Sequence, residues 1–207
     1  MLNAGALTFR EFMLSESLPL ATVHAAVLEF LRERDDVVVF GAQAVNAYVN
    51  EPRMAQDIAL LSTRAAELSE ELRVYLNQRF HIAVRVREIG AGRGYRLFQL
   101  QKTGNRHLVD LRPIAKLPST QRIERVLVIA PAELIAYKVI AYHQRRGQPK
   151  SGTDWRDLAM LLLTFPELKR DPGPVTEHLQ AANADAATLT VWAELVAQPI
   201  TPSDEEE

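Results

Sequence analysis

Two aspartates in strand-like segments carry the side chains that a metal ion would need. Asp57 lies in the alternating segment 56–61, where residues 57, 59 and 61 share one face of a predicted strand. Asp110 lies in a second predicted strand, 106–113, with the sequence RHLVDLRP. A pair of aspartates two residues apart on such a strand could bind one metal ion from one side, but the residue two positions after Asp57 is Ala59, which has no ligand atom. Asp110 could place a carboxylate beside Asp57 from a neighbouring strand instead.

A phosphate-binding turn is predicted shortly before Asp57. The apolar run Val37 to Phe40 predicts a buried strand, Gly41 interrupts it, and residues 42–49 have the spacing of a short helix. Free amides at the start of a helix bind phosphate, and a glycine lets the ligand approach the backbone. Gly41 and Ala42 are therefore candidate phosphate-binding residues. An ordinary tight connection between a strand and a helix would have the same sequence.

Two cations lie on the apolar side of a helix that Pro131 is expected to open. Helical spacing places Lys138 among apolar residues and Arg145 on the same side two turns later. A cation on such a face needs an anion or a route to water. Its partner could be Asp154 or Asp157 of the next helix, or the triphosphate of a nucleotide, and both can hold at once. Asp154 also follows a threonine that could cap this next helix, which would place Asp154 in its first turn.

A sheet and several helices are needed to bring these residues together. Residues 64–78 predict an amphipathic helix, and residues 81–88 and 95–101 predict a hairpin around the glycine-rich turn 90–94. Residues 114–122 predict a loop before a strand at 125–129, and helices are predicted beyond it, including 175–182 and 186–197. We therefore expect an α/β (α+β) fold with N-terminal helices over 1–36, a mixed sheet flanked by helices over 37–130, a helical C-terminal region over 131–200, and a disordered acidic tail over 201–207.

Composition excludes some classes of function. The chain has 207 residues, 47% of them hydrophobic, which is enough for a full core, and its net charge of -2 argues against general affinity for nucleic acid. It has no cysteine, and therefore no disulfide, thiolate metal site or cysteine nucleophile. Neither a membrane-spanning run nor a signal peptide is predicted, so the cytoplasm is the expected location.

The residues together resemble the nucleotidyltransferase superfamily, particularly the minimal nucleotidyltransferases and the abortive-infection AbiEii-type toxins. The family pattern has a Gly-Gly or Gly-Ser strand end, an arginine, often a threonine, an Asp-x-Asp motif, and a third aspartate on a later strand. In this chain those positions hold Gly41-Ala42, Arg53, Ala55, Asp57-Ile58-Ala59 and Asp110. A lysine-bearing helix and a following helix with paired aspartates are matched by Lys138, Arg145, Lys150, Asp154 and Asp157. The resemblance covers residues 37–165.

The resemblance implies a nucleotidyltransferase-like fold that transfers a nucleoside monophosphate from a Mg²⁺-bound nucleoside triphosphate to a hydroxyl of RNA or protein. It implies Asp57 and Asp110 as metal ligands and, with Lys138, as catalytic residues. The residues expected to bind the nucleotide are Gly41, Ala42, Arg53, Lys138 and Arg145.

The resemblance also implies a toxin-antitoxin or phage-defence system, with a cognate toxin or antitoxin as partner. However, Ala59 replaces the carboxylate that bridges two metal ions in the family. The alternative is therefore an inactive member that binds a nucleotide or a partner protein. A purely structural interaction domain, in which Lys138 only pairs with the next helix, is the third reading.

Overall fold

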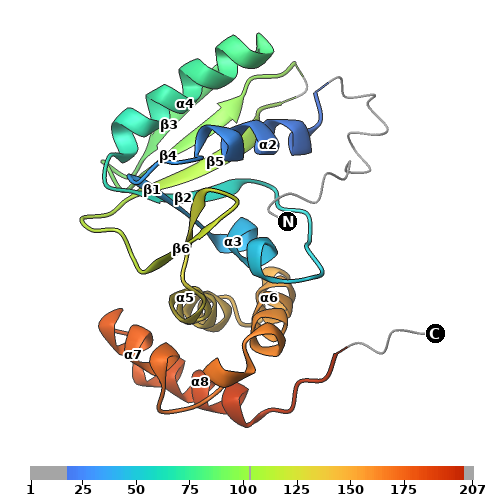
Figure 1. The fold of residues 1–207 in the computed structure, drawn as a ribbon, viewed down its shortest axis with the longest axis vertical. Helices are drawn as coiled ribbons and strands as arrows, with labels where there is room; N and C mark the ends of the chain where they lie inside the picture. The colour runs from blue at the N-terminus through green and yellow to red at the C-terminus, as the bar shows by residue number, and fades with distance from the viewer. Residues whose placement is uncertain (1–17, 103, 203–207) are drawn as a thin grey trace, which may run out of the picture. The chain divides into compact units, whose positions relative to one another are not determined.

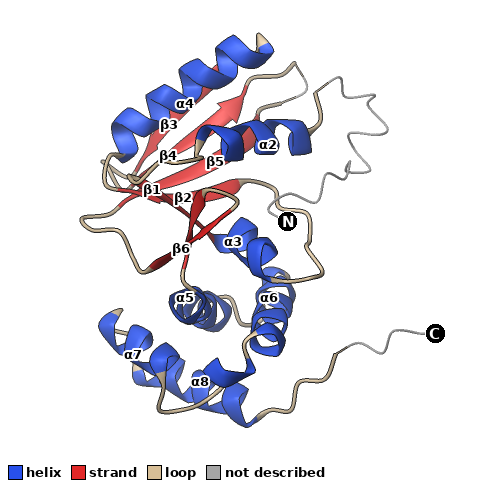
Figure 2. Cartoon of the chain, viewed as in Figure 1, coloured by secondary structure: helices blue, strands red, loops and turns tan. Residues whose placement is uncertain are grey.

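The computed structural model describes residues 18–102 and 104–202 of the chain. The backbone divides into two compact units, residues 1–129 and 130–207. All the strands among the described residues belong to the first unit, which we call the sheet unit, and the second consists of helices (Figure 2). The prediction of an α/β fold with a mixed sheet and a helical C-terminal part is confirmed.

The sheet is mixed, and its strands follow the order β3-β4-β5-β2-β1-β7-β6. Their bounds are Val37–Phe40 (β1), Ile58–Ser62 (β2), Val84–Ile89 (β3), Gly94–Gln99 (β4), Arg106–Pro113 (β5), Thr120–Ile123 (β6) and Val126–Ile129 (β7). Strand β2 pairs antiparallel with β1 and parallel with β5, which places these three strands side by side at the centre. The β1 strand is buried along its whole length, as its run of β-branched residues predicts for a central strand.

Helices cover the two faces of this sheet differently (Figure 1). Helices α2 (Leu20–Phe30) and α4 (Ala65–Phe80) contact each other and share one face. Helix α4 buries Leu68, Leu72 and Leu76, whose four-residue spacing forms a single stripe. The short α3 (Gly41–Tyr48) follows β1 directly and lies on the other face, where it contacts β1, β2 and β7. That second face keeps exposed polar side chains on β3, β4 and β5, and the candidate site lies there.

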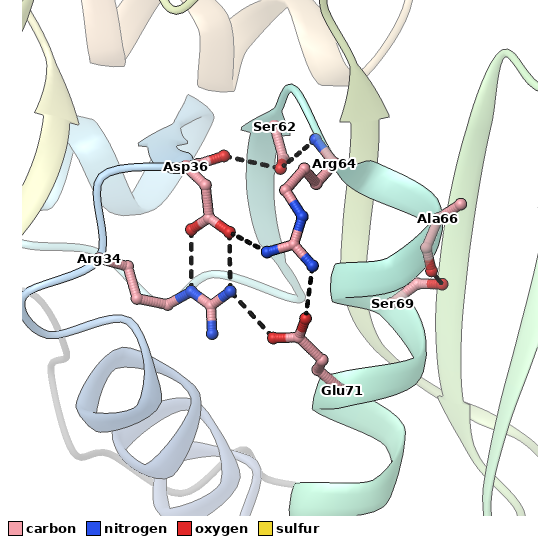
Figure 3. A network of polar contacts seen from close by, with 7 residues as sticks. All are labelled: Arg34, Asp36, Ser62, Arg64, Ala66, Ser69 and Glu71. Atoms are coloured by element: carbon pink, nitrogen blue, oxygen red, sulfur yellow. Dashed lines mark hydrogen bonds and ion pairs between the residues drawn. The ribbon is translucent and has the colours of Figure 1, made fainter.

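The start of β1 is fixed by a network of charges (Figure 3). Asp36 accepts hydrogen bonds from the guanidinium of Arg34 at 2.9 and 2.7 Å and from Arg64 at 3.1 Å, and Glu71 pairs with both arginines. The Arg34 hydrogen bond is the largest influence that holds the pKa of Asp36 below its usual value. The hydroxyl of Ser62 donates to the backbone carbonyl of Asp36 at 2.7 Å. The network thus ties the first residues of β1 to the end of β2 and the start of α4.

The helical unit packs around α5 (Pro131–Gln144), which contacts α6 (Lys150–Thr164), α7 (Pro174–Ala181) and α8 (Ala186–Ala197). A single turn of 3-10 helix, η1 (Pro166–Leu168), follows α6. Trp192 of α8 is fully buried, and its indole N–H donates to the hydroxyl of Thr176 at 3.2 Å. No helix within residues 18–102 and 104–202 combines the length and apolar character needed to cross a bilayer.

Three local predictions differ from the structure, and two predicted segments lie partly outside the described residues. The expected strand 56–61 begins only at Ile58, so Asp57 lies in the preceding bend. The expected loop 114–122 contains the start of β6, which forms a hairpin with β7. Helix α6 begins at Lys150, so the threonine before Asp154 is no cap and Asp154 lies beyond the first turn. Residues 1–17 of the predicted N-terminal helices and 203–207 of the predicted tail lie outside the part that the structure describes.

Candidate functional site

One row of residues crosses five strands on the face of the sheet that α3 shares. The strand register places Arg87 opposite Arg96, Arg96 opposite Asp110, Asp110 opposite Ala59, and Ala59 opposite Phe40. Residues directly opposite each other in a sheet point to the same face. We call these five residues, from Arg87 to Phe40, the cross-sheet row.

Gly41 lies directly over Ala59 of the cross-sheet row. A Cβ atom added to Gly41 would come within 3.1 Å of the Ala59 Cβ atom, and Gly41 has a φ of +70°. Both the close approach and the backbone angle therefore require glycine here. Because Ala59 also lies opposite Asp110, a side chain at position 59 would stand between the start of α3 and the Asp110 carboxylate. The fold thus brings Gly41, Ala59 and Asp110 together.

Asp110 lies between two arginines. Its oxygens are 3.6 Å from Nε of Arg96 and 3.7 Å from Nε of Arg112, and the carboxylate side chain is only 15% exposed. Arg112 follows Asp110 by two residues on β5 and therefore shares its face. The guanidinium of Arg112 also lies 5.3 Å from the centre of the Phe40 ring. One cation thus reaches from Asp110 across to the end of β1.

The other predicted ligand, Asp57, lies against a histidine. Its Oδ2 atom is 3.3 Å from Nδ1 of His107, whose Nε2 atom is 3.0 Å from the carbonyl oxygen of Val109. Each ring nitrogen of His107 therefore lies near an oxygen atom that can accept a hydrogen bond. The ring also stacks on Phe98 at a centroid distance of 5.0 Å, which fixes its orientation.

The carboxylates do not fit the magnesium site that the resemblance implies. Among residues 18–102 and 104–202, no group of three or more His, Cys, Asp or Glu side chains is placed to hold a metal ion. Asp57 faces His107, and Asp110 faces two guanidiniums. A Mg²⁺ bound about 2.1 Å from either Asp110 oxygen would lie within about 6 Å of the arginine nitrogen next to that oxygen, where like charges repel. The charges around Asp110 suit an anion better than a metal ion.

Helix α3 is anchored at two points next to this site. The buried side chain of Asn46 accepts a hydrogen bond from the backbone N–H of Arg53 at 3.0 Å and donates to its carbonyl at 2.7 Å. The loop that carries the predicted nucleotide ligand Arg53 is therefore held by α3. Tyr48 donates its hydroxyl to the carbonyl of Ile129 at 2.8 Å, and burial raises the pKa of Tyr48 to about 12.

The predicted cations of the helical unit both have carboxylate partners on α6. Nζ of Lys138 lies 2.6 Å from Oδ2 of Asp157, and the two side chains are 10% and 0% exposed. Arg145 donates through Nη1 to both oxygens of Asp154 at 3.0 and 2.8 Å. The ion pair with the next helix, one of the two alternatives left open above, is therefore present for both cations. A nucleotide contact by Lys138 or Arg145 remains a prediction.

Several residues of this site were not identified from the sequence. Arg112 could have been found, since it lies two residues after Asp110 in a strand whose alternation is clear. Arg96 and His107 could not, because their positions depend on the register between β4 and β5, which shifts by a bulge at Leu97 and Phe98. Asn46 could not be identified either, because the sequence does not show which backbone groups a buried asparagine of a short helix will contact.

Similar solved structures support the fold. The polyadenylate synthase of Megavirus aligns with a TM-score of 0.59 and 16% identity over 73% of this chain, which spans only 32% of that protein. A Helicobacter pylori protein considered to be a nucleotidyltransferase aligns with a TM-score of 0.55 and 12% identity, over 92% of this chain and 96% of its own. The antibiotic-resistance factor ANT(2'')-Ia aligns at 0.50 and 17% identity, over 83% and 93%. At these identities the likeness concerns the fold alone.

No curated protein matches the chain in sequence. The family described as nucleotidyl transferase AbiEii toxin, type IV toxin-antitoxin system, matches residues 25–206. That range includes nearly all of both units and confirms the resemblance first seen in Gly41, Asp57 and Asp110. This chain therefore belongs to the AbiEii nucleotidyltransferase family.

Proposed function

We propose that this chain is a nucleotide-binding member of its family that has lost the metal-dependent transfer of a nucleoside monophosphate. The observation that carries the proposal is the place of Ala59 in the cross-sheet row, opposite Asp110 and directly under Gly41. A carboxylate at position 59 would stand beside Asp110 and could share a metal ion with it, and alanine cannot. The imidazole of His107 beside Asp57 and the two guanidiniums beside Asp110 support the same conclusion.

The start of α3 supports the binding of a nucleoside triphosphate. Gly41 opens the helix with no side chain, so the free amides at Gly41 and Ala42 can approach a phosphate closely. Asn46 holds the backbone of Arg53, which keeps the loop before Asp57 next to this helix. These residues bind and orient the phosphates in our proposal. Family membership points to a cognate antitoxin or toxin as the protein partner.

The alternative is a working transferase that passes the nucleotide to a hydroxyl of RNA or protein. Incubation with each radiolabelled triphosphate, with Mg²⁺ or Mn²⁺ and total RNA or cell lysate, separates the two. We expect no labelling by the wild-type chain and labelling by the Ala59→Asp variant. Ala66→Asp is the matched control, because it adds the same carboxylate at an exposed position of α4 on the opposite face of the sheet.

Labelling by the wild-type chain that disappears in Asp110→Ala would overturn the proposal in favour of the transferase. If no triphosphate raises the melting temperature of the wild-type chain, the proposed nucleotide binding is wrong as well. Induced expression adds a test in cells. A member that has lost transfer should leave growth unchanged, whereas an active toxin should arrest it.

A further inference from the structure

The open face of β3, β4 and β5 carries more arginine than carboxylate. Arg87 and Arg96 belong to the cross-sheet row, and Arg112 flanks Asp110 on β5. Arg85 lies two residues before Arg87 on β3 and shares its face. All four arginines are exposed. Asp110 is the single carboxylate of the cross-sheet row, which also contains the guanidiniums of Arg87 and Arg96.

The guanidiniums keep most of their capacity to donate hydrogen bonds. Arg96 and Arg112 approach Asp110 through Nε at 3.6 and 3.7 Å, which is longer than a hydrogen bond, and their side chains are 46% and 56% exposed. Arg85 and Arg87 form no ion pair with any residue that the structure describes. A ligand could therefore engage all four without first breaking a short, buried pair.

A pocket lies beside these arginines. It has a volume of about 180 Å³ and is lined by Arg87, Glu88, Ile89, Gly90, Arg96 and Phe98. Arg87 and Arg96 thus line a hollow rather than a flat surface. The aromatic ring of Phe98 forms part of the wall and stacks on His107, which keeps the ring in place.

We propose that Arg87, Arg96 and Arg112 bind the triphosphate chain of a nucleotide directly, without a divalent metal ion. Guanidinium groups bind phosphate in a bidentate manner, with charge and hydrogen bonds in one contact. Arg96 and Arg112 lie beside Asp110, where the family resemblance implies magnesium, and Arg87 lies opposite Arg96 on the next strand. In the proposal, their positive charge replaces that of the metal ion. This inference rests on the nucleotide binding proposed above and deepens it by naming the groups that neutralise the phosphates.

Asp110 has the opposite role from a metal ligand in this proposal. Its carboxylate holds Arg96 and Arg112 in place and competes with phosphate for them. Removal of its charge should therefore strengthen the binding of a polyphosphate anion. At a metal site, the same change would remove a ligand and weaken Mg²⁺-dependent binding. The sign of the Asp110→Asn effect therefore distinguishes the two kinds of site.

Titration calorimetry on the full chain tests this, with inorganic tripolyphosphate, ATP and GTP as probes, in excess EDTA and again with Mg²⁺. We expect binding in EDTA that Mg²⁺ does not strengthen. Each of Arg96→Gln and Arg112→Gln should weaken it by about tenfold or more, the usual effect of losing a charged hydrogen bond. Asp110→Asn should tighten it. Arg73→Gln is the matched control, because Arg73 is a partly exposed arginine of α4, paired with Glu70, and its loss changes net charge equally.

Three results would count against the inference. Binding that requires Mg²⁺ and disappears in Asp110→Asn would overturn it but leave the proposed nucleotide binding intact. Equal weakening by Arg73→Gln and Arg96→Gln would show only a general attraction of anions to the protein. An absence of binding under both conditions would overturn this inference and the proposed function together. Since the substituted arginines are exposed, circular dichroism should show folded variants throughout, and Arg96→Lys should recover part of the affinity.

Discussion

Lys138 offers the sharpest test of what the helical unit contributes, because a structural pair and a nucleotide contact predict different losses. Its ammonium group lies 2.6 Å from Asp157, and the carboxylate of Asp157 is fully buried. Lys138→Met keeps the apolar stem and removes only the charge. Loss of one partner from a buried ion pair costs about 3–5 kcal/mol, because the other charge stays buried. Asp157 has further contacts that offset part of this cost, so we expect about 3 kcal/mol.

The reverse change should cost less. Asp157→Asn leaves Lys138 with 10% of its side chain exposed, and a lysine can extend toward water. We therefore expect Asp157→Asn to be less destabilising than Lys138→Met. The double variant Lys138→Met/Asp157→Leu replaces the pair with apolar groups and should recover most of the lost stability.

Urea unfolding followed by circular dichroism measures these differences in the free energy of unfolding. For a chain of this length, a loss of about 3 kcal/mol lowers the melting temperature by roughly 6–12 °C. The same variants should be titrated with ATP. The structural role of Lys138 would be refuted if Lys138→Met lost ATP binding yet unfolded within about 1 kcal/mol of the wild type, a difference well below that of a broken buried pair.

The remaining predictions concern α3. Gly41→Ala should destabilise the chain by more than about 1 kcal/mol, because φ is +70° and the new Cβ would crowd Ala59 at 3.1 Å; an unchanged melting temperature would contradict this. Asn46→Ala should cost about 1–3 kcal/mol, since it leaves the backbone groups of Arg53 without their partner, and limited proteolysis should then cut the loop before Asp57 faster. For Tyr48, the pKa of about 12 means that the folded chain keeps the phenol proton while an unfolded tyrosine loses it near 10.0. Wild-type stability should therefore be fully present below pH 10 and fall as the pH rises toward 12, and urea unfolding of Tyr48→Phe should show a smaller fall.

Much of the sheet could be predicted because its signals are local. The bounds of β1 and β5 match the expected segments 37–40 and 106–113, since a β-branched run marks β1 and turn residues precede β5. Pro131 marks the start of α5 in the same way. By contrast, β6 has the sequence Thr-Gln-Arg-Ile, which is too polar to predict a strand, and it forms because β7 offers an edge to pair with. Asp57 was placed on a strand because alternation extends to it, but the backbone bends before Ile58.

The chemistry of the site could be predicted only in part, because a carboxylate acquires its role from partners that are distant in sequence. From the sequence, Asp57 and Asp110 are predicted to be ligands of a metal ion. In the fold, β4 brings Arg96 to Asp110 across 14 positions of the chain, and Nδ1 of His107 on β5 lies 3.3 Å from Asp57. Asp57 lies beside an imidazole and Asp110 beside two guanidiniums, so neither aspartate faces another carboxylate. In our proposal, Asp110 is the anchor of two arginines. We therefore expect Asp110→Asn and Ala59→Asp to change ligand preference in opposite directions, the first toward free polyphosphate and the second toward its magnesium complex.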